Sequence, residues 1–290
     1  MKNLILSLGL SLISSFSLAD IYRLETLESE NSSQESRWAK VKDSKAVDKD
    51  EEVILLLHGA NIDSVEGKLS TYKPAIRELI SARALPAYAL GYNNSKDSTA
   101  KIKSEIKSAL SIFGKIHIYA HSMGADLVVS ALKEVEKDTL LQKIEKLVLI
   151  SAPLKGMKGF EQNFIVNFAL SGSGLSDLHA KSQFINSLGV ESKLHWGFPT
   201  YIVETPVHKG HPKQKQIPLS NLLFGFYSKQ NREHDTIVPV LGQEAVEVLT
   251  GDNVDDVHLV QADPDQFFHE SIALEPKKFI QWLLDNVVEL

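Results

Sequence analysis

Between residues 52 and 152 the chain alternates apolar runs with amphipathic stretches, and this alternation restricts the fold more than any other feature. The run at 52–60 is continuously apolar over most of its length, which is typical of a strand buried on both faces. Helical spacing of apolar residues follows at 72–82 and again at 99–113. Further strand-like runs lie at 85–90, 115–119 and 146–152. Strand alternating with helix four times predicts a parallel α/β sheet flanked by helices.

A serine lies at the turn between the strand expected at 115–119 and a helix-like stretch at 126–132. A sharp strand-to-helix turn with serine at its apex is typical of a nucleophilic serine. We expect the backbone of Ser122 to be strained, so its neighbours must be small where strand and helix approach closely. The small neighbours are Ala120, Gly124 and Ala125. The alternative is a small-residue turn that contains a serine by chance.

Four short motifs are His58-Gly59, the Ala-His-Ser-Met-Gly sequence at 120–124, the His-Asp-Thr-Ile-Val-Pro sequence at 234–239, and Phe268-His269. Together they resemble the α/β-hydrolase superfamily, and within it the bacterial lipases and carboxylesterases, some of which share the Ala-His-Ser-Met-Gly motif. The resemblance covers roughly residues 51–152 and 198–290. The common pattern has Gly where this chain has an alanine before the histidine, a sterically mild departure. The resemblance implies an α/β-hydrolase fold, with a mostly parallel central sheet flanked by helices and a cap or lid insertion.

In that superfamily the nucleophilic serine is followed along the chain by an acid and then a histidine, each in a loop after a strand. A serine needs such a base to take its proton, and the acid holds the base. The resemblance assigns Asp235 as the acid, downstream of the strand expected at 200–204. It assigns His269 as the base, about eight residues after the strand expected at 257–261 and before a helix expected at 277–288. Asp235 alternatively caps a turn.

Other acids and histidines compete for these two roles. The rival acids, which we interpret as a solvated turn after a glycine, are Asp252, Asp255 and Asp256. His258 lies inside an expected strand and suits packing or surface exposure. For the remaining candidates a surface position is the default, and these are His179, His195, His208, His211 and His234.

An oxyanion that develops on a substrate needs backbone donors set in place beforehand. The first expected donor is the N–H of Met123, at the start of the helix after Ser122. The second is the N–H of Ala60, in the turn after the first buried strand, with Asn61 as the fallback. Gly59 lets the backbone approach a substrate closely there, although it alternatively just ends a strand.

Two segments interrupt the alternation of strands and helices. The segment 155–197 is rich in Gly, Ser and Phe, and we interpret it as a cap or lid insertion. A second excursion spans 206–233. The Phe-rich part at 160–184 suits a lipid-like substrate and equally suits the packed core of a cap.

The amino-terminal residues 1–19 predict an export signal. Lys2 supplies the positive end, residues 4–18 form an apolar run with interspersed serines, and Ser17-Leu18-Ala19 matches a cleavage site before Asp20. The run is too short and interrupted for a membrane span. The chain has no cysteine, which excludes disulfides, thiolate metal sites and a lipid-modified cysteine. We therefore expect a periplasmic or secreted α/β-hydrolase domain at 20–290 with no integral membrane segment after signal removal.

Charge and ligand spacing exclude several other functions. The net charge is −6, and the locally basic stretch at 208–215 is short, so nucleic-acid binding has little support. His and carboxylate residues show no metal-ligand spacing, and no cofactor is implied. The expected activity is hydrolysis of small-molecule or lipid esters. Acyl transfer, amide hydrolysis and a non-catalytic binding role on the same fold remain the alternatives.

Overall fold

The computed structural model describes residues 20–27, 35–42, 47–60, 64–93, 97–135, 139–156, 188, 197–205, 249, 256–263, 266–267, 269 and 271–287. Every structural statement below concerns these residues. The expected signal peptide at 1–19 and nearly all of the two insertions at 155–197 and 206–233 lie outside them.

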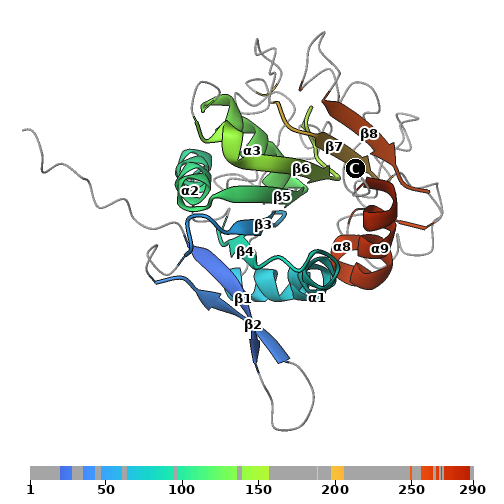
Figure 1. Ribbon diagram of the computed structural model, residues 1–290. Coiled ribbons are helices and arrows are strands. Elements are labelled where there is room, and N and C mark those ends of the chain that lie inside the picture. Colours follow the sequence, from blue (N-terminus) through green and yellow to red (C-terminus); the bar gives the residue numbers. More distant parts are fainter. Residues whose placement is uncertain are drawn as a thin grey trace, which may run out of the picture.

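An eight-stranded sheet forms the centre of the described part of the chain, in the order β2-β1-β4-β3-β5-β6-β7-β8 (Figure 1). The strands are β1 Ile21–Leu27, β2 Glu35–Lys40, β3 Glu52–Leu57, β4 Ala87–Leu90, β5 Lys115–His121, β6 Ile144–Ile150, β7 Thr200–Glu204 and β8 Val257–Gln261. Neighbouring strands from β4 to β8 are all parallel, whereas β1 runs antiparallel to both β2 and β4. The predicted mostly parallel sheet is confirmed.

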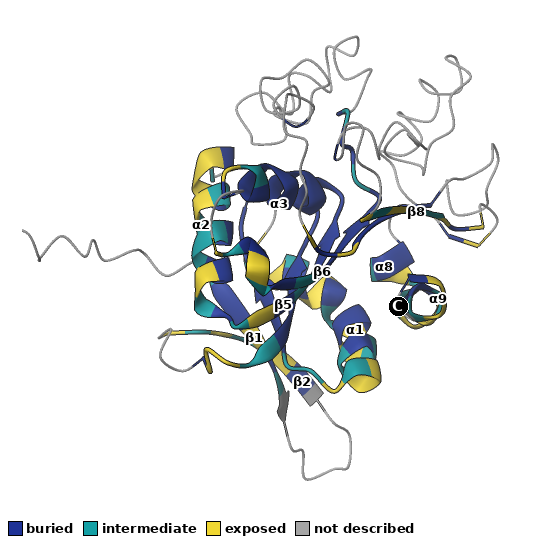
Figure 2. Ribbon diagram, turned by 45° about the horizontal axis from the view of Figure 1, so that its top comes forward, coloured by how far each residue is buried: buried dark blue, intermediate teal, exposed yellow. Residues whose placement is uncertain are grey.

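Helices cover both faces of this sheet, as a parallel sheet requires. One face carries α2 Thr99–Ile112 and α3 Met123–Lys133, and the other carries α1 Val65–Arg83, α8 Ser271–Leu274 and α9 Pro276–Val287. In Figure 2, α3 is buried almost throughout, whereas α2 keeps an exposed outer face. None of the helices in the described part of the chain has the length and apolar character needed to cross a bilayer.

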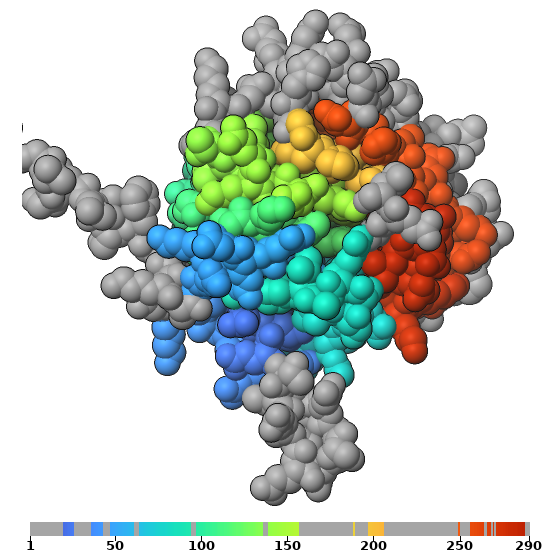
Figure 3. All heavy atoms as spheres, viewed as in Figure 1, coloured from blue at the N-terminus to red at the C-terminus, as the bar shows by residue number. Residues whose placement is uncertain are grey.

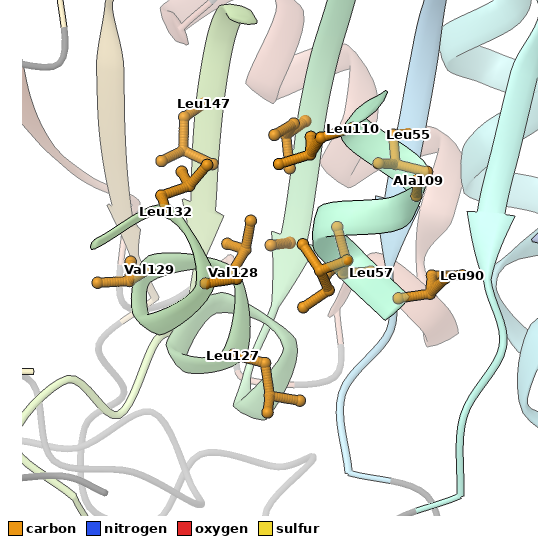
Figure 4. Close-up of a cluster of buried hydrophobic side chains, with 14 of the residues drawn as sticks. Leu55, Leu57, Leu90, Ala109, Leu110, Leu127, Val128, Val129, Leu132 and Leu147 are labelled. Carbon is orange, nitrogen blue, oxygen red and sulfur yellow. The ribbon is translucent and has the colours of Figure 1, made fainter. Parts of the chain in front are cut away.

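Strand β3 shows how one apolar run serves both layers. Because side chains alternate along a strand, Leu55 and Leu57 face the core under α2 and α3, whereas Ile54 and Leu56 face the core under α1 and α9. All four side chains are fully buried. Figure 4 shows Leu55 and Leu57 with the apolar side chains of α2 and α3 that pack on the same side of the sheet. The continuous apolar pattern of residues 53–57 follows from this double burial.

Helix α1 begins at Val65, well before the start predicted at residue 72. Ser64 caps it, since its Oγ accepts a hydrogen bond of 3.1 Å from the Gly67 N–H. Gly67 and Pro74 are poor helix formers, which weakens the helical signal of the first turns. Tertiary packing compensates: two side chains of these turns are fully buried against the sheet, Leu69 and Tyr72. The predicted boundary was therefore wrong because packing outweighs local propensity.

Smaller differences affect three other elements. Helix α3 begins directly after Ser122 rather than at residue 126, and β6 spans 144–150 rather than 146–152. The short helix α8 precedes α9, so the predicted final helix is preceded by a separate turn of helix. These shifts leave the predicted order of elements unchanged.

The two amino-terminal strands lie at one edge of the sheet and pack beside α1 (Figure 3). The Trp38 Nε1–H donates to the Leu69 carbonyl at 2.9 Å, and Lys73 Nζ donates to the Ser36 carbonyl at 2.9 Å. These bonds fasten β2 to the helix that contains Tyr72.

Candidate active site

The predicted site residues follow the carboxyl ends of parallel strands, where ligands bind in open α/β sheets. Ala60 follows β3, Ser122 and Met123 follow β5, and His269 follows β8. The predicted acid Asp235 and the fallback donor Asn61 lie outside the described residues.

Ser122 lies at the turn between β5 and α3, with φ 52° and ψ −129°. This conformation is strained for a residue with a Cβ, as expected from the sequence. The Ser122 N–H donates to the Ile150 carbonyl of the neighbouring strand β6 at 2.8 Å, which fixes the turn against the sheet. The serine is 7% exposed. Its hydroxyl is therefore presented from a nearly buried, rigid turn.

The glycines around this turn allow backbone segments to approach closely. A Cβ on Gly124 would lie 2.4 Å from the His58 carbonyl oxygen, and a Cβ on Gly59 would lie 3.1 Å from Ser122 Cβ. The first distance is shorter than any real carbon–oxygen contact and the second is tight. The contact at Gly124 agrees with the predicted need for a small residue there, and the contact at Gly59 shows that the turn after β3 lies directly against Ser122.

His269 brings its ring to the serine. Its Nε2 lies 3.0 Å from Ser122 Oγ, within hydrogen-bonding distance, although the two residues are 147 positions apart in the chain. His269 is only 2% exposed. This contact has the geometry required for a histidine to take a proton from a serine hydroxyl.

Two carboxylates among the described residues are candidates for the acid that holds the histidine, Asp256 and Glu204. The rival Asp256 is exposed, in the turn before β8, and its carbonyl accepts from the Thr200 N–H at the start of β7. It therefore lies at the amino-terminal ends of the parallel strands, whereas Ser122 lies at their carboxyl-terminal ends. Glu204 is the last residue of β7, so it lies at the same ends of the strands as Ser122. It is buried and accepts a 2.9 Å hydrogen bond from Gln261 Nε2. Glu204 falls within a strand expected from the sequence, where the pattern gives no sign of a role in the site.

His58 fixes the peptide that carries the expected oxyanion donor of Ala60. Its Nδ1–H donates to the Gly59 carbonyl at 2.7 Å, while its Nε2 accepts from the Tyr92 N–H at 3.4 Å. In a trans peptide the next N–H points away from the carbonyl, so this bond also sets the direction of the Ala60 N–H. Met123, the first residue of α3, has its N–H at a helix start, where such groups lack intrahelical acceptors.

Full burial of the His58 ring lowers its pKa from 6.5 to about 3. Between these values the unfolded chain binds a proton on His58 that the folded protein does not. The contribution of His58 to the free energy of unfolding is therefore fully present above pH 6.5 and decreases as the pH falls toward 3. We expect His58 to contribute a slope of up to about 1.4 kcal/mol per pH unit to the free energy of unfolding.

Urea unfolding at pH 7, 6 and 5 measures this slope. His58→Asn keeps an amide donor for the Gly59 carbonyl and does not titrate, so its pH dependence should be shallower than that of the natural protein. Equal slopes for the two proteins would contradict the assignment.

A second group of bonds, which the sequence did not reveal, surrounds His121. Its Nδ1 lies 2.7 Å from the Tyr72 hydroxyl, and its Nε2 lies 2.8 Å from the His269 carbonyl oxygen. The Tyr72 hydroxyl also accepts from the Gly59 N–H at 3.1 Å. His121 was visible in the Ala-His-Ser-Met-Gly motif, but no sequence signal connects it with Tyr72.

The part of the chain that the structure describes has no group of three His, Cys, Asp or Glu side chains able to hold a metal ion.

Comparison with known proteins agrees with this architecture. The family model described as alpha/beta hydrolase of unknown function (DUF900) matches residues 30–164, a segment that includes Gly59 and Ser122. No curated protein matches the chain in sequence. The family match and the solved structures described next show an α/β-hydrolase fold, in agreement with the resemblance that the sequence motifs indicated.

Two carboxyl esterases of known structure share this fold at low sequence identity. Carboxyl esterase 2 from the mycorrhizal fungus Tuber melanosporum is 14% identical, with a TM-score of 0.52, over 91% of this chain and 86% of the esterase. A metagenomic carboxyl esterase is 13% identical, with a TM-score of 0.52, over 82% of this chain and 76% of that one. For Aspergillus fumigatus lipase B the identity is 16% and the TM-score 0.44, and the match covers 53% of this chain but only 37% of the lipase.

Proposed function

We propose that this protein is a serine hydrolase that cleaves carboxylic esters through an acyl-enzyme. The observation that carries the proposal is the 3.0 Å approach of His269 Nε2 to the hydroxyl of Ser122 at a strained strand-to-helix turn. The turn and the histidine follow two different strands of an α/β-hydrolase sheet, and two neighbours of similar fold are named as carboxyl esterases.

The proposed reaction begins when Ser122 Oγ attacks the ester carbonyl carbon while His269 Nε2 takes the hydroxyl proton. The N–H groups of Met123 and Ala60 stabilise the negative charge on the carbonyl oxygen. The C–O bond to the alcohol then breaks, and His269 returns the proton to the departing alcohol. Water attacks the acyl-enzyme with its proton passing to His269, which then protonates Ser122 Oγ as the acid leaves. Asp235 is proposed to orient the imidazole.

Substrate and location are proposed from the sequence. The Phe-rich segment at 160–184 suits esters with longer acyl chains as well as it suits the packed core of a cap, and the signal-like residues 1–19 favour export to the periplasm or medium. A series of p-nitrophenyl esters of increasing acyl length tests the first point. Activity limited to short chains would argue against a lipase.

A fluorophosphonate probe tests the reaction class without knowledge of the substrate. The natural protein should be labelled, and mass spectrometry should locate the label on the peptide that contains Ser122. A folded preparation that stays unlabelled would favour a non-catalytic binding protein. If labelling occurs, product analysis with competing alcohols or peptide substrates separates ester hydrolysis from acyl transfer and amide hydrolysis.

A further inference from the structure

Four groups from three distant parts of the chain form a continuous series of hydrogen bonds beside Ser122. The series begins at the Gly59 N–H, passes through the Tyr72 hydroxyl and the His121 ring, and ends at the His269 carbonyl. Its three distances are 3.1, 2.7 and 2.8 Å. All three bonds are buried, so water competes little for their donors and acceptors.

The two ends of the series determine its direction. A backbone N–H only donates and a carbonyl only accepts, so Gly59 donates to the Tyr72 oxygen and His121 Nε2 carries the hydrogen that it donates to His269. In the neutral ring Nδ1 is then an acceptor, and the Tyr72 hydroxyl donates to it. Each donor has an acceptor in this arrangement, and the bonds polarise one another in the same sense.

We propose that His121, held as its Nε2–H tautomer by Tyr72, is a positioning residue that sets His269 relative to Ser122. The proposal deepens the function proposed above and rests on it. His121 is the residue directly before Ser122, and its ring lies 4.8 Å from the His269 ring. A single side chain thus joins the segment that presents the nucleophile to the segment that presents the base.

The same series of hydrogen bonds also holds Gly59, the residue before the expected oxyanion donor Ala60. The Tyr72 hydroxyl holds the Gly59 N–H, and His58 holds the Gly59 carbonyl, so the residue before Ala60 is fixed on both sides. Loss of the Tyr72 hydroxyl should therefore loosen both the turn that contains Ala60 and the segment that contains His269. Small misplacements of this kind cost large factors in rate, because catalysis depends on alignment of the reacting groups.

The kinetic test compares Tyr72→Phe, His121→Phe and the double variant. Each single change keeps an aromatic ring and removes hydrogen bonds, and each should slow fluorophosphonate labelling and ester turnover by about 10- to 100-fold with KM little changed. The double variant should be no slower than the slower single variant, because either change breaks the same series. His121→Gln, whose amide can donate to the His269 carbonyl, should recover part of the rate.

Tyr88→Phe is the matched control. Tyr88 is another fully buried tyrosine, but its hydroxyl donates to Glu51 at 3.3 Å, outside this hydrogen-bond series. Its removal should leave the labelling rate unchanged. Equal behaviour of Tyr72→Phe and Tyr88→Phe, additive effects in the double variant, or no recovery in His121→Gln would overturn the proposal.

A spectroscopic measurement on the natural protein does not depend on any variant folding. The measurement is a two-bond ¹H–¹⁵N NMR correlation spectrum of protein that contains ¹⁵N-labelled histidine. The His121 signals are assigned by their loss in His121→Gln, and they should show the neutral Nε2–H tautomer. In Tyr72→Phe the tautomer population should shift toward Nδ1–H. Any other protonation state in the natural protein would overturn the proposal. Absence of labelling in the natural protein would instead remove the proposed function, so the two failures are distinguishable.

Discussion

Replacement of Ser122 by alanine is expected to lower kcat/KM for an ester substrate by at least about four orders of magnitude. The reason is that the variant has no oxygen to attack the carbonyl, and the imidazole and backbone donors alone give only residual catalysis. The measurement is steady-state hydrolysis of a p-nitrophenyl ester, together with loss of fluorophosphonate labelling.

Ser151→Ala is the matched control for this substitution. Ser151 is also a buried serine with positive φ, at the carboxyl end of the adjacent strand β6, where its Oγ lies 2.9 Å from Thr205 Oγ1. We expect this variant to lose some stability, about 1 kcal/mol for the hydrogen bond, and to keep its activity. Comparable losses of activity in both serine variants would show that Ser122 does not act as the nucleophile.

Replacement of Asp235 by asparagine is expected to reduce kcat by about 10³- to 10⁴-fold. An amide leaves the size of the side chain unchanged but would favour the wrong tautomer of His269, which Asp235 is proposed to orient. Steady-state kinetics across a pH series measures this effect, and the protein should remain folded because only one oxygen is replaced.

Glu204→Gln distinguishes Glu204, the last residue of β7, from Asp235, which comes later in the chain. Glu204 ends that strand, and its carboxylate accepts from Gln261, so its replacement should alter packing at the strand ends with much less effect on kcat. A large loss of kcat in Glu204→Gln together with a small loss in Asp235→Asn would transfer the role of the acid to Glu204.

The sequence predicts the central fold well because the same physical signal acts in every layer. Buried parallel strands such as β3 must be apolar on both faces, and the helices that cover them must be apolar on one face, so the alternation is visible without coordinates. The strained turn at Ser122 was also predictable, because a strand-to-helix reversal there leaves room only for small residues such as Gly124.

Long-range pairings were less accessible. Tyr72 and His121 are 49 residues apart, and His121 and His269 are 148 residues apart, so their hydrogen bonds depend on how the layers pack. The start of α1 was misjudged for a related reason: Gly67 and Pro74 weaken local helix propensity, and burial against the sheet outweighs them. A role for Glu204 is not predictable either, because a buried strand end does not itself indicate a polar role.

The backbone of Ser122 has a further consequence. Its φ and ψ are close to the mirror image of an extended conformation, which glycine adopts freely and which costs other residues about 1–3 kcal/mol. Folding by itself would thus be better served by glycine at this position than by the hydroxyl side chain found there. Attempts to raise the heat resistance of this protein by choosing the most favourable residue at every site would consequently tend to remove this hydroxyl.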